Sequence, residues 1–354
     1  MRNRLLITAL AALGLAACEA PGRAPAPGTV TIMTFNVENL FDTRDDEGKD
    51  DHTFLPLAAK QTDEHRAKCA EIEVDRWREQ CLYWDWNEAL LEVKLQLVAG
   101  AILQVGEGRG PEILALQEIE NLAILDRLRR DYLAPAGYRD PVLIEGDDLR
   151  GIDVAFLTRL PLAGPPRLHP IRFDGGFADR AGDTRGILEA TFSLPDGSLL
   201  TGFSVHFPAP FHPTAMRVAA YERLNGLLAA LPPDRVVFAA GDFNTTSAED
   251  AREDLLGRYV RPHWTVAHEL GCREPCPGTS YYARDGSWSF LDMLLWSPAR
   301  RGADATWVLR ADSVRLANGG PGQRRPDGTP DRFDATSGTG VSDHWPLVMT
   351  IQSE

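Results

Sequence analysis

Apolar residues along this chain gather in short continuous runs separated by polar and glycine-rich segments. A run of about five apolar residues suits a strand that is covered on both faces. Such runs predict strands at residues 29–37, 111–119, 151–159, 186–194, 198–207, 235–243, 289–297 and 345–351.

Three segments instead have the spacing of an amphipathic helix: 84–105, 121–131 and 213–231. Residues 42–56 and 312–342 are polar and are predicted to be long loops. The alternation of strand and helix signals, without a fixed-period repeat, indicates one α/β domain with two hairpin-rich halves.

The first 18 residues differ from the rest. Arg2 and Arg4 precede an apolar core of about a dozen residues, which is the form of a secretory signal and is too short to span a membrane comfortably. Leu15-Ala16-Ala17-Cys18 resembles a bacterial lipoprotein signal, in which Cys18 becomes the lipidated first residue; a simple cleaved signal is the alternative.

Residues 19–28 are rich in Pro, Gly and Ala and are expected to be a flexible tether, so the globular domain is predicted to span 29–354. We therefore expect a protein of the bacterial cell envelope, anchored by lipid and facing the periplasm or the exterior, with a secreted form as the fallback. The formal charge of -14 and the pI near 5.1 argue against a broad basic face for nucleic acid, but not against a pocket that holds cations.

The cysteines fit export. Beyond Cys18 there are four, and an even number in an exported chain favours disulfides. Four cysteines allow three pairings, and the short separations favour Cys69 with Cys81 and Cys272 with Cys276. A zinc site is the alternative, although neither pair has the two-residue spacing of common zinc modules.

Polar residues recur at the ends of the predicted strands, where α/β folds place their sites. In VVFAAGDFNTT, at 236–246, Gly241 permits a tight exit from the strand, and two polar side chains follow it. Any one such residue can be structural, whereas a series in this order favours a site. The series is Asn36, Glu38, Glu118, His206, Asp242, Asn244, Asp292, Asp343 and His344.

The segments TFNVENLF, LALQEIEN, SVHF, AAGDFNTT, FLDMLLW and SDHWPL resemble successive motifs of the endonuclease/exonuclease/phosphatase superfamily, of the deoxyribonuclease-like type. The resemblance covers residues 29–351. It implies an α/β four-layer sandwich, with two packed and mainly antiparallel β-sheets flanked by helices, and metal-dependent hydrolysis of a phosphate ester.

The resemblance also implies a role for each residue of the series except Glu38, which can reach the metal through water. Glu118 is the expected chief metal ligand, with Asn36 beside it and Asp343 across the pocket. These oxygen ligands suit Mg²⁺, with Mn²⁺ or Ca²⁺ as alternatives.

The remaining residues are assigned to catalysis by the same resemblance. Asp242 is expected to orient and deprotonate the attacking water, and Asn244 to hold a phosphoryl oxygen or the metal shell. His344 is expected to donate to the phosphate while Asp292 fixes its tautomer, and His206 to act as acid or base.

Two further residues are less clearly placed. Arg185 lies where some relatives carry an arginine that contacts phosphate, and a surface salt bridge is an equal alternative. Asp153 is a candidate partner for His206, although an acid at the start of a strand is commonly a turn residue.

Residues 42–87 are predicted to be an insertion near the pocket mouth. Their aromatic residues, Trp77, Tyr83, Trp84 and Trp86, can stack nucleic-acid bases, but burial under the loop is the commoner outcome. The acids of DTRDDEG can bind Ca²⁺, although the spacing is not that of an EF-hand.

We therefore predict a monomeric, lipid-anchored, Mg²⁺-dependent phosphodiesterase, a nuclease acting on nucleic acid. A phosphatase or a sphingomyelinase-like phospholipid phosphodiesterase is the alternative within the enzyme class. The alternative outside that class is a catalytically silent binding lipoprotein.

Overall fold

The computed structural model describes residues 28–297 and 307–353. The strands of the first sheet are β1 (Thr29–Leu40), β2 (Ile113–Ile119), β3 (Val142–Leu143), β4 (Asp153–Thr158), β13 (Trp307–Leu316) and β14 (Leu347–Ser353). Those of the second sheet are β5 (Arg167–His169), β6 (Ile187–Ser193), β7 (Leu199–His206), β8 (Val236–Asp242), β9 (Thr265–Val266) and β12 (Asp292–Ser297). A separate hairpin consists of β10 (Ser280–Tyr282) and β11 (Ser287–Ser289).

The helices are α1 (Asp63–Ala70), α2 (Asp75–Tyr83), α3 (Glu88–Leu103), α4 (Leu122–Arg127), α5 (Thr214–Ala230), α6 (Ser247–Glu253) and α7 (Ala267–Leu270). A π-helical turn, Leu128–Tyr132, continues α4. Among the helices that the structure describes, none has the length and apolar character needed to cross a membrane.

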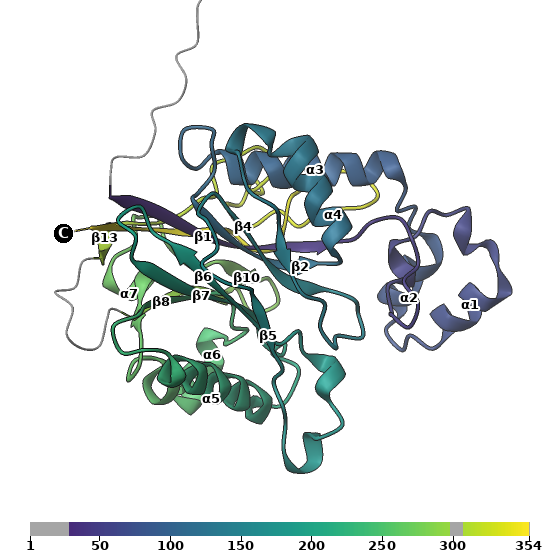
Figure 1. The fold of residues 1–354 in the computed structure, drawn as a ribbon. Coiled ribbons are helices and arrows are strands. Elements are labelled where there is room, and N and C mark those ends of the chain that lie inside the picture. Colours follow the sequence, from purple (N-terminus) through teal and green to yellow (C-terminus); the bar gives the residue numbers. More distant parts are fainter. Residues whose placement is uncertain (1–27, 298–306, 354) are drawn as a thin grey trace, which may run out of the picture.

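The two sheets have the strand orders β13-β14-β1-β2-β4-β3 and β5-β6-β7-β8-β12-β9. Each contains one parallel pair, β1 with β2 and β7 with β8, and its other pairs are antiparallel. Helices α3 and α4 cover the outer face of the first sheet, and α5 and α6 lie on the outer side of the second (Figure 1). The predicted four-layer sandwich is therefore confirmed.

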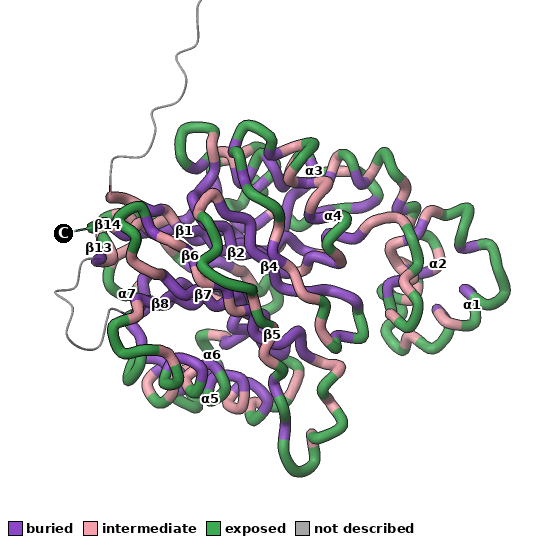
Figure 2. The backbone as a smooth tube through the Cα atoms, viewed as in Figure 1, coloured by how far each residue is buried: buried purple, intermediate pink, exposed green. Residues whose placement is uncertain are grey.

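Three apolar clusters hold these layers together. One lies between the first sheet and α3, one between the two sheets, and one between the second sheet and α5. Phe156 of the first sheet meets Phe192 and Phe238 of the second with ring centroids 5.5 and 6.2 Å apart. The central strands are buried on both faces (Figure 2), which explains why their sequences are continuous apolar runs.

All the predicted strands are present, with ends that move by a few residues. The helix predicted at 84–105 begins at Glu88, because the side chain of Asn87 accepts from Leu90 N (3.0 Å) and caps it. The loop predicted at 312–342 is wrong at its start, where β13 continues to Leu316. This strand lies at the sheet edge, so polar and partly exposed residues interrupt the apolar signal.

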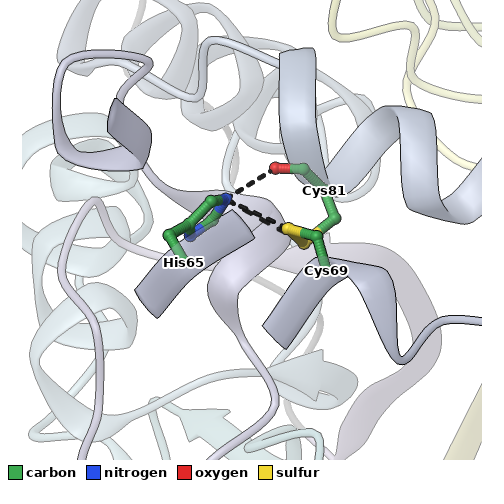
Figure 3. Close-up of side chains that lie close together, drawn as sticks. All are labelled: His65, Cys69 and Cys81. Atoms are coloured by element: carbon green, nitrogen blue, oxygen red, sulfur yellow. Dashed lines mark hydrogen bonds between the residues drawn. A yellow bond between two sulfur atoms is a disulfide. The ribbon is translucent and has the colours of Figure 1, made fainter. Parts of the chain in front are cut away.

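The insertion contains α1 and α2, which lie to one side of the sandwich (Figure 1). The disulfide Cys69–Cys81 joins these helices, with Cα atoms 5.7 Å apart, and the other predicted disulfide, Cys272–Cys276, is also formed. The ring Nε2 of His65 lies 3.1 Å from Cys69 Sγ and 3.0 Å from the carbonyl oxygen of Cys81 (Figure 3).

The aromatic residues of the insertion have different environments. Trp86 is buried and its Nε1 donates to Phe41 O (3.2 Å), whereas Trp84 is half-buried and Trp77 and Tyr83 are exposed. Burial under the loop is therefore confirmed for Trp86 and wrong for Trp77 and Tyr83. The predicted signal, the lipidated Cys18 and the tether up to residue 27 lie outside the described residues.

Candidate active site

The polar residues at the strand ends gather at one edge of the sandwich. Strands β1, β2, β7 and β8 run toward this edge and contribute residues at or near their carboxyl ends, Asn36, Glu118, His206 and Asp242. Strands β12 and β14 run in the opposite direction, so Asp292 begins β12 and His344 precedes β14. Asp242 is paired in register with His206 on one side and Asp292 on the other.

The backbone at this edge has an unusual conformation. Glu38, Asn39, Glu118 and Asn244 all have positive φ, between 52° and 65°, which is uncommon for residues other than glycine. Pairing of β2 with its neighbours also shifts register at this point. Non-glycine residues in the left-handed region persist where the surrounding contacts fix them, and they often cluster at functional sites.

Gly241 meets the steric condition that the sequence suggested. Its φ is +152°, and a Cβ atom there would lie 2.0 Å from the carbonyl oxygen of Val205 in the neighbouring strand. Only glycine therefore permits the close approach of β7 and β8 directly before Asp242.

Asp242 is the centre of the site. Its Oδ2 accepts from Asn36 Nδ2 (3.1 Å) and lies 3.5 Å from His206 Nε2 and 3.9 Å from His344 Nε2, while its Oδ1 accepts from Asn244 N (2.8 Å). Burial raises the pKa of Asp242 to about 7, with Asp292 acting in the same direction and His344 opposing. This carboxyl group can therefore exchange a proton near neutral pH.

His344 and Asp292 form a buried pair. His344 Nδ1 lies 2.6 Å from Asp292 Oδ2, and Asp292 is fully buried. Burial alone lowers the pKa of His344, but the charges of Asp292, Asp242 and Asp343 outweigh it and hold that pKa well above its ordinary value. His344 is thus an imidazolium whose Nε2 faces Asp242.

His206 has the opposite character. Burial, together with the positive charge of Arg185, holds the pKa of His206 well below its ordinary value. Its Nδ1 is buried and has no hydrogen-bond partner in the part of the chain that the structure describes. His206 is therefore a neutral imidazole beside Asp242, whose pKa is raised. Two neighbouring groups with such different pKa values can act as acid and base in one reaction.

Carboxylates form a second group beside Asp242. Glu118 accepts from Asn36 Nδ2 (3.2 Å) and from Asn39 N (2.9 Å). Burial favours the neutral form of Glu118, but the positive charge of Arg150, with a smaller effect of Arg185, outweighs it and keeps its pKa below the ordinary value. Glu118 is therefore ionised.

Glu38 and Asp343 share one cation, Arg332. The guanidinium contacts Glu38 through Nε and lies 3.0 Å from Asp343 Oδ2 through Nη2. Burial and Asp343 raise the pKa of Glu38 to about 7 despite Arg332. Burial also opposes ionisation of Asp343, but His344 and Arg332 keep its pKa below the ordinary value.

The two amides at this edge have hydrogen bonds that bear on their predicted roles. Asn36 presents its amide nitrogen to both Glu118 and Asp242, so in this arrangement it joins the two carboxylates. Asn244 donates from Nδ2 to Phe207 O (2.9 Å), which ties it to the loop after β7. Their assignment to the metal and to the phosphate stays a prediction.

Arg185 and Asp153 are both buried, and their predicted contact with substrate stays a prediction. Arg185 is buried, and its Nε lies 3.3 Å from Asp148 Oδ1, so the surface salt bridge is wrong. Asp153 accepts from Gly146 N (2.9 Å), while in the described part of the chain His206 Nε2 faces Asp242 and His206 Nδ1 has no hydrogen-bond partner, so the predicted pairing of Asp153 with His206 is wrong. The start of β4 turns its carboxyl group toward the 146–152 loop, and burial raises the pKa of Asp153 to about 7.

Three basic residues of the site are not evident from the sequence. Arg332 lies in the polar 312–342 segment, and Arg150 in a loop, where its Nη2 donates to Asn39 Oδ1 (2.5 Å). Lys94 is fully buried on α3, where it donates to Val341 O (2.6 Å). The only signal for Lys94 is a charged residue on the apolar face of a helix.

The donor set fits a hard divalent cation. Ionised Glu118 and Asp343 offer oxygen atoms, and Asp292 Oδ1 is a buried oxygen without a hydrogen-bond partner among the described residues. Asp242, Asp292 and His344 also have ligand atoms within 4.8 Å of one another. An acidic, partly buried group of this kind favours a cation with oxygen ligands over zinc held by nitrogen and sulfur.

Comparison with known proteins agrees with this architecture. Residues 33–344 match the family model described as the Endonuclease/Exonuclease/phosphatase family. An endonuclease/exonuclease/phosphatase from Bacteroides vulgatus is similar in structure, with a TM-score of 0.53 and 14% identity over 92% of this chain and 99% of that chain. No curated protein matches the sequence.

Two further structures show the same fold. An endonuclease/exonuclease/phosphatase from Beutenbergia cavernae gives a TM-score of 0.52 and 15% identity over 92% of this chain and 72% of that chain. TDP2 of D. rerio, complexed with a single-strand DNA product, gives a TM-score of 0.51 and 16% identity over 92% of this chain and 99% of that chain.

Proposed function

Because the chain belongs to the endonuclease/exonuclease/phosphatase family, we propose that it is a metal-dependent phosphodiesterase that hydrolyses nucleic acid outside the cytoplasm. Family membership indicates that the protein is a hydrolase of the metal-dependent phosphoesterase type. The observation that best supports a catalytic centre is the buried contact of Asp242 with Asn36, His206 and His344 at one edge of the two sheets.

In the proposed mechanism, Asp242 removes the proton from the attacking water. Its pKa of about 7 permits this transfer near neutral pH, and Asn244 N and Asn36 Nδ2 fix the direction of its two oxygens. His344 donates from Nε2 to a phosphoryl oxygen, because Asp292 holds Nδ1 and keeps the ring charged. His206 is neutral and serves as a proton acceptor or a neutral donor beside the phosphate.

A divalent cation held by Glu118 and Asp343, with Glu38 and Asn36 beside them, would neutralise the phosphoryl oxygens and stabilise the departing oxygen. We propose Mg²⁺ as this cation, with Mn²⁺ or Ca²⁺ as alternatives. Arg332 already balances part of the charge of Glu38 and Asp343. Its position supports a site built for one strongly charged ion and an anionic ester.

Nucleic acid is proposed as the substrate on two grounds. D. rerio TDP2, which has the same fold, was determined with a single-strand DNA product. Arg150 is exposed at the site and interacts with Asn39 and Glu118, so it can also reach a substrate phosphate. The net charge of -14 implies that such contacts are local and that binding is weaker than in proteins with a broad basic face.

The test is an assay of the purified chain with Mg²⁺ against plasmid DNA, RNA, bis-p-nitrophenyl phosphate and sphingomyelin. Cleavage of DNA or RNA supports the proposal, whereas cleavage of sphingomyelin alone, or of small phosphate monoesters alone, replaces it with the lipid or phosphatase alternative. Replacing His206 by Ala or Asp242 by Asn should lower turnover at least about a hundredfold with a nearly unchanged melting temperature. No turnover with any ester would favour a binding protein.

We also propose that the protein is a monomer and is anchored to the bacterial envelope by lipid on Cys18. The support is the sequence Leu15-Ala16-Ala17-Cys18, which follows a short apolar segment. A Cys18→Ser protein should leave the membrane fraction. Persistent membrane association of that variant would remove the lipid anchor from the proposal.

A further inference from the structure

The acid-rich loop after β1 folds onto the end of β2 and brings three carboxylates together outside the catalytic centre. Asp46 and Asp51 come from the loop, and Glu120 directly follows β2. Ligand oxygen atoms of these three residues all lie within 4.8 Å of one another. Acidic clusters are common on protein surfaces, so the state of each carboxylate decides whether this one is a site.

Two of the three carboxylates are buried and incompletely paired. Asp51 is 1% exposed and Glu120 is 3% exposed. Asp51 Oδ1 and Glu120 Oε1 are buried oxygens without a hydrogen-bond partner in the described ranges 28–297 and 307–353. An unpaired buried oxygen on an acid costs free energy unless a cation or a donor meets it.

The second oxygen of each buried acid is fixed by the loop itself. Asp51 Oδ2 accepts from Asp46 N (2.9 Å), and Glu120 Oε2 accepts from Asp42 N (2.5 Å) and from Asn121 Nδ2 (3.2 Å). The loop is therefore ordered around the carboxylates by its own backbone. It leaves one oxygen of each acid available for another partner.

Basic side chains do not supply that partner. No lysine or arginine of the described chain forms an ion pair with Asp46, Asp51 or Glu120. Lys49, the lysine of the same loop, donates to the carbonyl oxygens of Asp148 (2.8 Å) and Gly146 (3.5 Å).

His52 is the nearest titratable base to this cluster. Its Nδ1 lies 2.9 Å from Asp45 Oδ1 and 3.6 Å from Asp51 Oδ1, so Asp45 is its principal partner. Burial, with the neighbouring acids, raises the pKa of Glu120 to about 9 and that of Asp51 to about 6, and no lysine or arginine of the described chain forms an ion pair that offsets this.

We propose that Asp46, Asp51 and Glu120 bind a Ca²⁺ ion that fixes the 42–52 loop to the end of β2. Ca²⁺ takes six to eight oxygen ligands in a flexible geometry, so carboxylates whose ligand oxygens lie within 4.8 Å of one another can hold it together with waters. Mg²⁺ requires a near-ideal octahedral geometry and gives up its waters reluctantly, which suits a site formed by a loop less well.

Solvent has access to the site. A groove of about 650 Å³ is lined by Asp46 and Asn121 and continues along Asp126, Asp140 and Glu145. Arg129 of the same groove pairs with Asp126 and Asp140, so the groove adds little free negative charge but admits the waters that complete the coordination of Ca²⁺ at Asp46.

The proposed ion has a structural role distinct from that of the catalytic cation. Glu120 is two residues after Glu118, and the loop directly follows the part of β1 that carries Asn36. Fixing the loop would therefore hold the ends of both strands in place. The inference rests on the carboxylate geometry alone and does not depend on the proposed function.

The test uses the full chain carrying Glu118→Gln, so that the catalytic centre contributes little, after removal of metal by chelation. CaCl₂ is titrated by isothermal titration calorimetry, and melting temperatures are measured in EDTA and in Ca²⁺. Asp51→Asn and Glu120→Gln are each added, and Glu47→Gln is the matched control, because Glu47 is exposed in the same loop.

We expect one Ca²⁺ ion to bind and to raise the melting temperature, with affinity at least about tenfold weaker in Asp51→Asn and Glu120→Gln and unchanged in Glu47→Gln. Wild-type affinity in both variants, or no heat and no melting shift with millimolar Ca²⁺, would overturn the site. If either variant fails to fold, Asp46→Asn decides, because its side chain is only half-buried: unchanged affinity there rejects the proposal.

Discussion

The pair formed by Asp292 and His344 gives the most direct test of the proposed mechanism. In Asp292→Asn the shape of the side chain and the bond from its backbone N–H to Thr279 Oγ1 (3.0 Å) are retained, while the negative charge beside His344 Nδ1 is lost. A hydrogen bond to a charged group contributes about 1.5–3 kcal/mol. If this hydrogen bond stabilises the transition state by that amount, its loss in Asp292→Asn lowers turnover about 10- to 150-fold.

The same change has a predictable effect on pH dependence. In the wild type Asp292 and the neighbouring acids outweigh burial and raise the pKa of His344, so the imidazolium persists to high pH. Without the charge of Asp292 that pKa falls, and the alkaline limb of the kcat profile should move to lower pH. The assay is hydrolysis of bis-p-nitrophenyl phosphate with saturating Mg²⁺ from pH 5 to 9, together with NMR titration of the His344 ring.

A matched control is Asp312→Asn, which removes an exposed acid paired with Arg310 and should leave kcat unchanged. Turnover within about twofold of wild type in Asp292→Asn, with an unmoved titration of His344, would refute the role of the charged pair. A lower rate with an unmoved titration would show that Asp292 acts by packing and not by its charge.

The remaining predictions concern metal, strand packing and pH. EDTA should abolish hydrolysis and Mg²⁺ or Mn²⁺ should restore it, so unaltered rates in chelator would contradict a catalytic cation. Gly241→Ala should destabilise the fold by about 1–3 kcal/mol or more in urea unfolding, because the new Cβ meets Val205 O at 2.0 Å. Gly226→Ala, in α5 with open space around it, is the control and should be neutral or stabilising. Burial lowers the pKa of His268 to about 4, so between about pH 6.5 and 4 the unfolded chain binds more protons than the folded chain. The free energy of unfolding therefore decreases as the pH is lowered through that window, by up to about 3 kcal/mol. In His268→Phe this part of the pH dependence of urea unfolding should disappear.

The local pattern of apolar residues was enough to predict most of the strands. The run Val236 to Ala240 predicts β8 because a strand buried between a sheet and a helix layer is apolar on both faces. Edge strand β13 escaped prediction because only one side of it needs to be apolar. Helices α1 and α2 were also missed, since their sequences are polar and the disulfide Cys69–Cys81 supplies part of the constraint that burial supplies elsewhere.

For the site, the sequence predicted which residues gather but not how they pair. Glu118, His206, Asp242, Asp292 and His344 follow from their positions at strand ends, and the structure brings them to one edge. Their catalytic roles remain predictions that the proposed assays test.

Only the tertiary structure determined the charge partners. Arg332 lies 294 residues from Glu38, and Asn36 lies 206 residues from the Asp242 that it contacts. The same holds for Glu120, which meets the acids of the 42–52 loop only because β1 and β2 are neighbours. The sequence by itself determined which faces are buried, because hydrophobic periodicity is a local property; partners, burial of charge and the resulting pKa shifts depend on packing between distant segments, which no local pattern encodes.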